Sequence, residues 1–160
     1  MKKQGFTLIE LMVVIVIMGI LAAVAVPKLF GMIAKSKASE VGPAAGTYVK
    51  LQDAFVAEDG VNVGDWTAIG YNMQSSNNFD YTETDLKGGS AALKNLKDKV
   101  GWTATNKAKL NDCAALSNWT IKLSESTTAS KGSPIVYTAA APDVNGNCNA
   151  LTPNFTNIGK

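Results

Sequence analysis

The 160-residue sequence contains no histidine and no arginine, and its charges almost cancel, with 15 basic side chains against 13 acidic ones. Without histidine, the chain lacks the commonest general base and the commonest zinc ligand in proteins. Without arginine or a strong excess of positive charge, nucleic-acid binding through phosphate neutralisation is poorly supported. The sequence also lacks the His-Glu-x-x-His, phosphate-loop and Gly-x-Ser-x-Gly motifs of familiar enzyme classes. We therefore expect no enzymatic activity, no cofactor and no metal site.

The most prominent feature that is present is an apolar run near the N-terminus. From Phe6 to Val26, every residue is apolar, Gly or Thr except Glu10. A run of this length can span a hydrocarbon core of about 30 Å at about 1.5 Å per residue. A carboxylate inside such a run is costly in lipid and is by default a functional site with a partner to be named. For Glu10 the predicted partner is an α-amino group, which a cut between Gly5 and Phe6 would create.

Two other interpretations of this run compete with that prediction. In an ordinary secretory signal peptide, the early lysines would be the basic region and Ala23-Val24-Ala25 would precede the cleavage site. Glu10 argues against this interpretation, because a carboxylate does not belong early in the apolar region of a signal peptide. The second interpretation is a plain membrane anchor, for which the run is long enough.

A short basic leader, Gly5 and then Phe6-Thr7-Leu8-Ile9-Glu10 follow one another at the N-terminus. This order resembles the class III signal of the type IV pilin family. The resemblance continues through Gly19 to Pro27 and Lys28, whereas the rest of the chain resembles the family only in general layout. It implies a type IVa-like major pilin, which is a structural subunit of a surface filament.

The resemblance also implies how the N-terminus is processed and used. A prepilin peptidase in the membrane cuts after Gly5 and methylates the new amino group of Phe6. Glu10 then attracts the Phe6 ammonium group of a neighbouring subunit, which cancels two charges that lipid would penalise. Such a pair sets the axial register of the filament, a role that is better supported for buried ion pairs than a large gain in stability.

The implied partners follow from this life cycle. They are inner-membrane lipid before assembly, the prepilin peptidase, the pilus assembly machinery of the inner membrane, and other copies of the chain in a helical homopolymer. The implied location is first the inner membrane of a bacterium and then its surface filament, or fimbrium. Cell adhesion, twitching motility and DNA uptake all use this subunit design. The residues give no support to DNA or a host surface as a direct partner.

Two alternatives come from other classes of protein. A pseudopilin of a type II secretion system carries the same N-terminal signal, and a signal-anchored periplasmic binding module would never polymerise. The C-terminal part is rich in Asn and Thr and contains the two cysteines. This composition fits a surface-exposed pilin better than a pseudopilin.

We expect three segments: a leader (1–5), a hydrophobic transmembrane and filament-core helix (6–27), and a head domain (28–160) that includes the amphipathic half of the helix. Apolar spacing predicts one helix that begins near Phe6 and continues to Glu58, with Asp59-Gly60 as its end.

Two sites should disturb this helix. Pro27 and the Gly42-Pro43 pair should interrupt it, because a proline inside a helix removes a backbone hydrogen bond and crowds the preceding turn. The resemblance implies that the segment from Gly19 to Pro27 loses helix when subunits pack into a filament. Phe30 precedes the amphipathic stretch and is expected to pack between subunits.

The C-terminal region predicts an α+β fold, in which an antiparallel sheet of about four strands packs on the second half of the long helix. The strand candidates are Asn78–Glu83, Trp102–Thr105, Trp119–Leu123 and Pro134–Ala139. Short helices are expected over Ala91–Lys99 and Lys107–Leu116. The expected core contains Tyr48, Leu51, Phe55, Phe79, Tyr81, Trp102, Ile121 and Val136.

Cys113 and Cys148 are the only cysteines in the sequence. Because the chain is predicted to leave the cytoplasm, we expect a disulfide between them, closing a loop of about 36 residues worth roughly 3–4 kcal/mol. In pilins a similarly placed pair bounds an exposed variable loop, the D-region, so the resemblance assigns this disulfide-closed C-terminal loop to that role. The stretch from Asp143 to Asn147 faintly resembles a calcium loop, but its glycine comes too early for an EF-hand, and a turn is expected.

Overall fold

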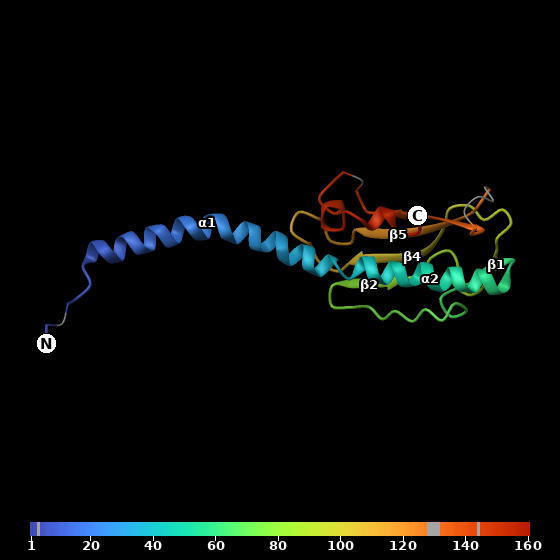
Figure 1. The fold of residues 1–160 in the computed structure, drawn as a ribbon, viewed down its shortest axis with the longest axis horizontal. Helices are drawn as coiled ribbons and strands as arrows, with labels where there is room; N and C mark the ends of the chain where they lie inside the picture. Colours follow the sequence, from blue (N-terminus) through green and yellow to red (C-terminus); the bar gives the residue numbers. More distant parts are fainter. Residues whose placement is uncertain (3, 128–131, 144) are drawn as a thin grey trace.

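A computed structural model describes residues 1–2, 4–127, 132–143 and 145–160 of the chain. An N-terminal helix extends far beyond the rest of the molecule, which folds into a head around the C-terminal end of the helical region (Figure 1). In the head, an antiparallel sheet lies against the second half of the helical region. The predicted α+β architecture is confirmed.

The predicted long helix is present as one helical region from Leu8 to Asp59, which a short joint divides into two consecutive helices. Helix α1 (Leu8–Ala38) continues through Pro27 without ending, and the predicted kink or break at this proline stays a prediction. Helix α2 (Val41–Asp59) follows after a short joint and ends at Gly60, whose φ of 78° is that of a left-handed C-cap. The predicted stop at Asp59-Gly60 is therefore confirmed.

The joint between the two helices lies at Ser39 and Glu40. Pro43 has no backbone N–H, so the carbonyl of Ser39, four residues earlier, receives no helical hydrogen bond from it. Pro43 itself lies in the first turn of α2, where a missing N–H does no harm. The predicted effect of the Gly42-Pro43 pair is thus confirmed, but the break lies just before the pair.

The main sheet has four antiparallel strands in the order β2, β4, β5, β6. All four predicted strand segments are confirmed, as β2 (Phe79–Thr82), β4 (Lys99–Asn106), β5 (Asn118–Glu125) and β6 (Ile135–Ala140). A separate pair joins β1 (Asn62–Val63) to β3 (Ala91–Ala92). Two 3-10 helices near the C-terminus are η2 (Asn149–Leu151) and η3 (Phe155–Asn157).

Inward-facing strand residues and one face of α2 form the core. Its largest fully buried side chains are Tyr48, Phe79, Trp102, Trp119, Ile121 and Leu123. Leu51 and Phe55 are partly buried against it. The core prediction for Val136 is wrong, because this side chain is 43% exposed. Ile135 and Tyr137 occupy the inward positions of β6, and the two-residue period of a strand places Val136 on the opposite face.

The two short helices predicted in the head do not form. Residues 91–99 contain β3, a turn and the beginning of β4, and residues 107–116 form turns around a bridge between Leu110 and Cys113. Four residues in these segments have positive φ, which a right-handed helix excludes: Asn95, Asp98, Asn111 and Leu116. Leu93, Leu96 and Leu110 are buried in the core, so tertiary packing has overridden local helix propensity.

Gln52 links α2 to the segment that follows it. The side chain is fully buried. Its Nε2 donates to the carbonyl of Gly64 at 2.8 Å, and its Oε1 accepts from the N–H of Gly64 at 2.9 Å. Nε2 also lies 3.2 Å from the hydroxyl oxygen of Tyr48, to which it donates. One side chain therefore satisfies both backbone groups of a buried glycine.

Gly101 permits close packing between β4 and α2. The register between β4 and β5 shifts from Val100 to Trp102, on either side of this glycine. A Cβ atom built on Gly101 would collide with the Tyr48 hydroxyl and would lie 2.6 Å from Cδ1 of Leu123. The bulge therefore needs glycine at this position.

Candidate functional site

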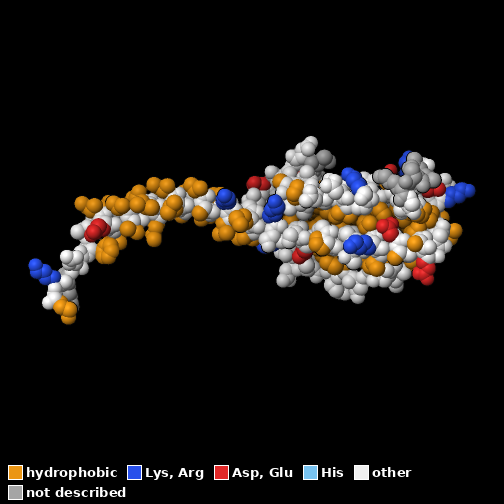
Figure 2. All heavy atoms as spheres, in the orientation of Figure 1, with side chains coloured by type: hydrophobic (Ala, Val, Ile, Leu, Met, Phe, Trp, Pro, Cys, Tyr) orange, Lys and Arg blue, Asp and Glu red, His pale blue; other side chains and the backbone are white. Residues whose placement is uncertain are grey.

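The first part of α1, from Leu8 to Ile33, is largely uncovered by the described part of the head, and we call this segment the stem. Its large apolar side chains are between 42% exposed at Val14 and 73% exposed at Leu8. The first buried residue of α1 is Ala34. Figure 2 shows these apolar side chains along the visible face of the stem. By length and composition, this one helical region can cross a membrane, and an apolar surface of this extent needs lipid or protein against it.

Glu10 caps the beginning of the stem. Its Oε2 accepts hydrogen bonds from the Thr7 N–H at 2.8 Å and from the Thr7 hydroxyl at 2.6 Å. Oγ1 of Thr7 accepts in turn from the Glu10 N–H at 3.3 Å. This reciprocal arrangement is a capping box, which satisfies backbone donors that the first helical turn leaves free. The negative carboxylate also lies at the positive end of the helix dipole.

The capping role of Glu10 was missed at the sequence level. Thr, two residues and then Glu before an apolar run is the sequence signature of a capping box, and Thr7 to Glu10 matches it. Glu10 therefore has a structural role within its own chain in addition to any role between chains. An experiment on Glu10 must separate its capping of its own helix from any pairing of its charge with another subunit.

Gly5 and Phe6 precede the stem in an exposed, non-helical stretch. Phe6 is 85% exposed, and a side chain added to Gly5 would meet no atom within 4 Å. The peptide bond between the two residues is therefore open to another protein, as a proteolytic cut requires. Within the described part of the chain, the carboxylate bonds of Glu10 go to Thr7 and not to Phe6.

Gly19 and Pro27 both lie inside the continuous helix α1. A Cβ on Gly19 would meet no described atom within 4 Å, so no contact among the described residues requires glycine there. Glycine lowers helix stability by about 1 kcal/mol relative to alanine, and proline removes a helical hydrogen bond. The loss of helix between these two residues on assembly stays a prediction.

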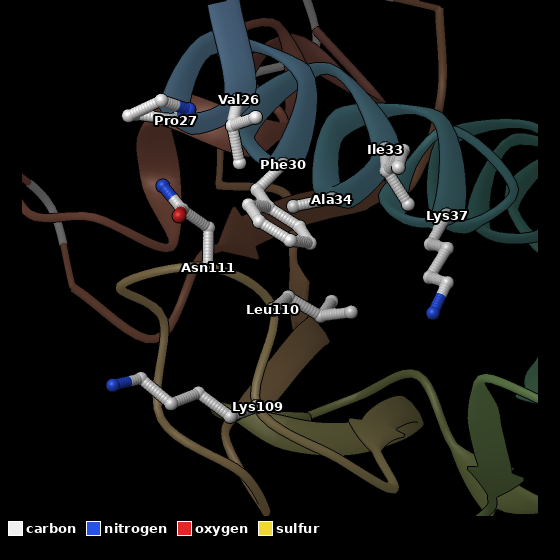
Figure 3. A pocket seen from close by; sticks show the side chains of 9 residues that line it. All are labelled: Val26, Pro27, Phe30, Ile33, Ala34, Lys37, Lys109, Leu110 and Asn111. Carbon is white, nitrogen blue, oxygen red and sulfur yellow. The ribbon is translucent and has the colours of Figure 1, made fainter. Parts of the chain in front are cut away.

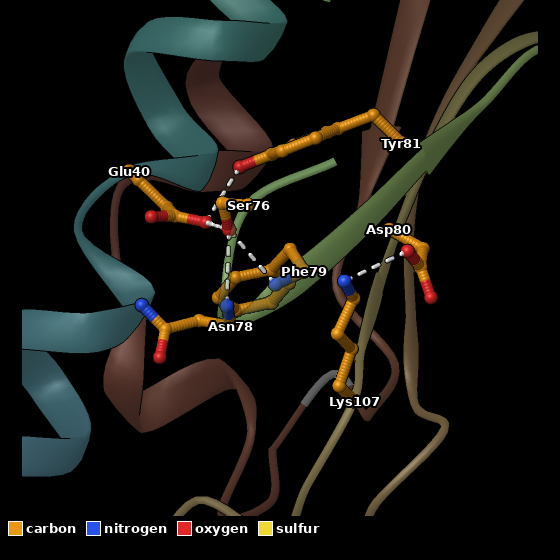
Figure 4. A network of polar contacts seen from close by, with 7 residues as sticks. All are labelled: Glu40, Ser76, Asn78, Phe79, Asp80, Tyr81 and Lys107. Atoms are coloured by element: carbon orange, nitrogen blue, oxygen red, sulfur yellow. Dashed lines mark hydrogen bonds and ion pairs between the residues drawn. The ribbon is translucent and has the colours of Figure 1, made fainter. Parts of the chain in front are cut away.

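A polar cluster fastens the head to the joint between α1 and α2 (Figure 4). Oε1 of Glu40 accepts hydrogen bonds from the Ser76 hydroxyl and, at 3.0 Å, from the Tyr81 hydroxyl. Oγ of Ser76 accepts from the backbone N–H groups of Asn78 and Phe79. Burial, followed by the bond to Glu40, raises the pKa of Tyr81, so this hydroxyl remains a donor. The cluster went unnoticed in the sequence because Glu40 lies 36 and 41 positions from its two partners.

The disulfide between Cys113 and Cys148 is present, with an S–S distance of 2.07 Å and a Cα–Cα distance of 4.7 Å. This confirms the predicted pairing. The bond joins the turn after β4 to the residue before η2, so β5 and β6 lie inside the closed loop. Both sulfur-bearing residues are buried, which makes the bond part of the core.

The Asp143 side chain, in the stretch that faintly resembles a calcium loop, binds backbone N–H groups of a turn. The Asp143 carboxylate accepts hydrogen bonds from the N–H groups of Cys148 at 3.2 Å and Asn149 at 2.8 Å. These bonds hold the turn beside the disulfide, while Val144 lies outside the described residues. Among the residues that the structure describes, no group of three or more His, Cys, Asp and Glu side chains is placed to hold a metal ion.

Comparisons with known proteins agree with the geometry of the N-terminus. Residues 1–26 match the family model described as the prokaryotic N-terminal methylation motif. The chain is 33% identical over 97 residues to the type IV major pilin protein PilA of Myxococcus xanthus, covering 61% of this chain and 44% of that protein. It is 38% identical over 101 residues to a fimbrial protein of Neisseria meningitidis, covering 61% of this chain and 52% of that protein.

A shorter and more similar match involves the type IV major fimbrial protein FimA of Dichelobacter nodosus, which is 56% identical over 39 residues, 24% of this chain and 25% of that protein. No solved structure matches the chain. The matches to the first relatives span about half the length of those proteins. The names of the relatives are those of filament proteins, in agreement with the prediction that the chain is not an enzyme. The methylation motif and these relatives support the prediction that the chain is a type IV pilin.

Proposed function

We propose that the chain is a structural subunit of a type IV pilus and that it acts by assembly. The observation that carries this proposal is the uncovered apolar surface of the stem. Exposed apolar surface of this extent promotes association in water. Membrane lipid before assembly, and the stems of neighbouring subunits afterwards, are two environments that remove the surface from water.

The proposed subunit has three parts. Residues 1–5 are a leader that a prepilin peptidase removes, residues 6–27 are the transmembrane and filament-core helix, and residues 28–160 form the head. The exposed backbone at Gly5 and Phe6 supports the cut. The match of residues 1–26 to a methylation motif supports methylation of the new Phe6 amino group.

In the filament, Glu10 pairs with the Phe6 ammonium group of a neighbouring subunit. The cap does not prevent this pairing, because both cap bonds go to Oε2 and an ionised carboxylate has about four lone-pair sites. Each charge is expensive in an apolar core when alone, and pairing reduces that expense. The pair therefore selects the axial offset at which two stems can pack.

The proposed location is the inner membrane before assembly and a surface fimbrium afterwards. The proposed partners are inner-membrane lipid, the prepilin peptidase, the pilus assembly machinery and other copies of the chain. The filament would serve adhesion, twitching motility or DNA uptake. The relatives that match are named as pilin and fimbrial proteins, so the pseudopilin alternative is not favoured.

Three substitutions separate the charge of Glu10 from its capping role. Glu10→Ala removes both, and Glu10→Gln removes the charge but keeps a side chain that caps at the same position. Thr7→Ala removes the cap acceptor and keeps the charge. For each variant, surface filaments are sheared from cells and quantified, and the N-terminus of the membrane and filament forms is determined by intact mass and sequencing.

We expect the wild-type filament protein to begin at Phe6 and to carry one extra methyl group. Both Glu10 variants should still be cut after Gly5, with filament yield or methylation strongly reduced, whereas Thr7→Ala should assemble. Wild-type yield and methylation in both Glu10 variants would refute the charge-pair role. A chain that begins at Val26 would mean conventional secretion, which removes Glu10 and overturns the whole proposal.

A further inference from the structure

A groove between α1 and the loop after β4 continues the apolar surface of the stem as far as the head (Figure 3). Phe30 on the helix points toward Leu110 on the loop, while Lys37 and Lys109 lie at opposite ends of the groove and point apart. This groove therefore belongs with the stem surface that we assign to assembly. A different pocket, which no residue of the stem lines, lies on the head.

We call this second cavity the head pocket. It lies between the turn that follows β1 and the segment at the end of β2, and it is lined by residues 65–67, 71–73, 81–83 and 87–88. Its volume is about 600 Å³, within the range of about 300–1,000 Å³ that is typical of small-molecule sites. A pocket of this size, with a few polar groups and perturbed pKa values, is a candidate binding site.

The partly buried lining of the head pocket combines negative charge with apolar surface. Its four partly buried residues are Asp65, Trp66, Met73 and Glu83. Lys87 is exposed, and it is the one basic side chain among the described residues of the lining. The two carboxylates are therefore less solvated than the single ammonium group.

Hydrogen bonds and ring contacts fix the wall around Trp66. Its backbone N–H donates to Oε1 of Glu83 at 2.9 Å, and its Nε1 donates to the carbonyl of Gly101 at 2.8 Å. Its ring also meets the ring of Tyr71 edge to face, with the centroids 4.8 Å apart. These contacts form without a ligand, so a ligand would have to order few side chains when it binds.

The two carboxylates of the head pocket lack a cationic partner in the described part of the chain. Glu83 accepts a hydrogen bond on Oε1, and Asp65 accepts one on Oδ1 from the backbone of its own turn. Among the described residues, this leaves one oxygen of each carboxylate for a ligand. Burial raises the pKa of Glu83, and the charge of Asp65 raises it further. A bound cation would stabilise both ionised carboxylates.

This lining favours one class of ligand. A calcium ion takes six to eight oxygen ligands, whereas no group of three or more metal-ligating side chains exists among the residues that the structure describes. An anion would be repelled by the two carboxylates. An alkylammonium ion carries both a positive charge and apolar carbon atoms, and tryptophan attracts such cations more strongly than the other aromatic side chains do.

We propose that the head pocket binds one small organic cation of the alkylammonium class, with its charge beside the two carboxylates and its carbon atoms against Trp66 and Met73. Choline is a suitable probe of this class. Neohexyl alcohol, in which a carbon atom replaces the charged nitrogen, is its neutral control of the same shape. The site lies on the head, so the proposal does not depend on filament assembly.

The full chain is purified in a mild non-ionic detergent, because phosphocholine detergents carry the same cation as the probe. Trp66 is partly exposed whereas Trp102 and Trp119 are fully buried, so a change in tryptophan fluorescence reports mainly on the pocket. Ligand-observed NMR gives an independent Kd. We expect choline to bind saturably with a Kd of roughly 1–10 mM, and neohexyl alcohol to bind at least about five-fold more weakly.

Four substitutions test the charges. Glu83→Gln and Asp65→Asn keep the oxygen that accepts the backbone hydrogen bond, and each should weaken choline binding about three- to ten-fold. Asp85→Asn removes the same charge close by in the sequence, but Asp85 does not line the pocket, so Kd should change less than about two-fold. Lys87→Gln should strengthen choline binding about two-fold, because it removes a like charge. Urea unfolding checks that each variant is folded.

Several outcomes would overturn this site. Equal Kd values for choline and neohexyl alcohol would show that the charge is not recognised. Equal effects of Glu83→Gln and Asp85→Asn would show only a general field of the head. Weaker choline binding in Lys87→Gln would contradict the proposed charge complementarity, and this exposed substitution remains decisive if a variant of a partly buried residue unfolds. No saturable binding of choline up to about 0.1 M would refute the site altogether.

Discussion

Gln52→Met should destabilise the head strongly although methionine has a similar length and suits a core. The wild-type side chain makes two hydrogen bonds to Gly64, at 2.8 and 2.9 Å, and one to Tyr48 at 3.2 Å. Gly64 is buried, so the substitution leaves its N–H and its carbonyl without the partner that Gln52 provides. Each such loss costs about 1–3 kcal/mol, and we expect a total of about 2–5 kcal/mol.

Urea unfolding of the full chain in detergent micelles measures this loss. Trp102 and Trp119 are fully buried, so their fluorescence reports the unfolding of the head. With a slope of about 2 kcal/mol per molar urea, the midpoint should fall by about 1–2.5 M. Lys50→Met on the exposed face of the same helix is the matched control and should change stability by less than about 0.5 kcal/mol.

A further variant tests the hydrogen-bond reasoning directly. Gln52→Glu introduces a buried carboxyl whose pKa burial should raise. When protonated, it can donate to the Gly64 carbonyl again, so this variant should gain stability relative to Gln52→Met as pH falls. A midpoint for Gln52→Met within about 0.3 M of wild type, roughly 0.6 kcal/mol, with an unchanged slope would refute the reasoning.

Three other perturbations test the head. Replacing Cys113 and Cys148 by serine should cost roughly 3–4 kcal/mol and lower Tm by roughly 10–20 °C. Gly101→Ala forces a Cβ into the Tyr48 hydroxyl, and calorimetry should show a loss of about 1–3 kcal/mol. Hydrogen bonding, first from Ser75, lowers the pKa of Asp80. The stability that its ionised form contributes is therefore complete above the ordinary Asp pKa near 3.9 and is lost as pH falls through the lower folded-state pKa. In Asp80→Asn, the free energy of unfolding should therefore fall less steeply as the solution is acidified.

Each of these predictions has a control and a contrary outcome. Dithiothreitol should lower the Tm of the wild type but leave the serine double variant unchanged, and an equal response would contradict the role of the disulfide. Gly89→Ala is the control for Gly101, since its Cβ would meet no atom within 4 Å; equal losses would show that crowding at Gly101 is not the cause. If the free energy of unfolding of Asp80→Asn falls with acidification as steeply as that of the wild type, Asp80 does not contribute to the acid sensitivity of the head.

Two segments of the head show where a local sequence pattern predicts the structure correctly and where it does not. Trp119–Leu123 alternates apolar and polar residues, and it formed β5 with its apolar residues inward. Ala91–Lys99 has the composition of a short helix, yet its leucines at 93 and 96 are anchored in the core while Asn95 takes positive φ. Helix propensity differs among most residues by less than about 1 kcal/mol each, so a few buried contacts outweigh it over nine residues.

By itself, the sequence determined several features of residues 1–43. They are the length of the apolar run, the position of its one carboxylate, the glycine before the expected cut, and the proline-directed break between the helices. Each depends on residues that are neighbours along the chain. Only the tertiary structure decided where Gln52 finds Gly64, where Glu40 finds Ser76 and Tyr81, and which loop faces Phe30 to form a groove. The hydrogen-bonded partners are 12 to 41 positions apart, and no local periodicity encodes which distant segments will bury one another.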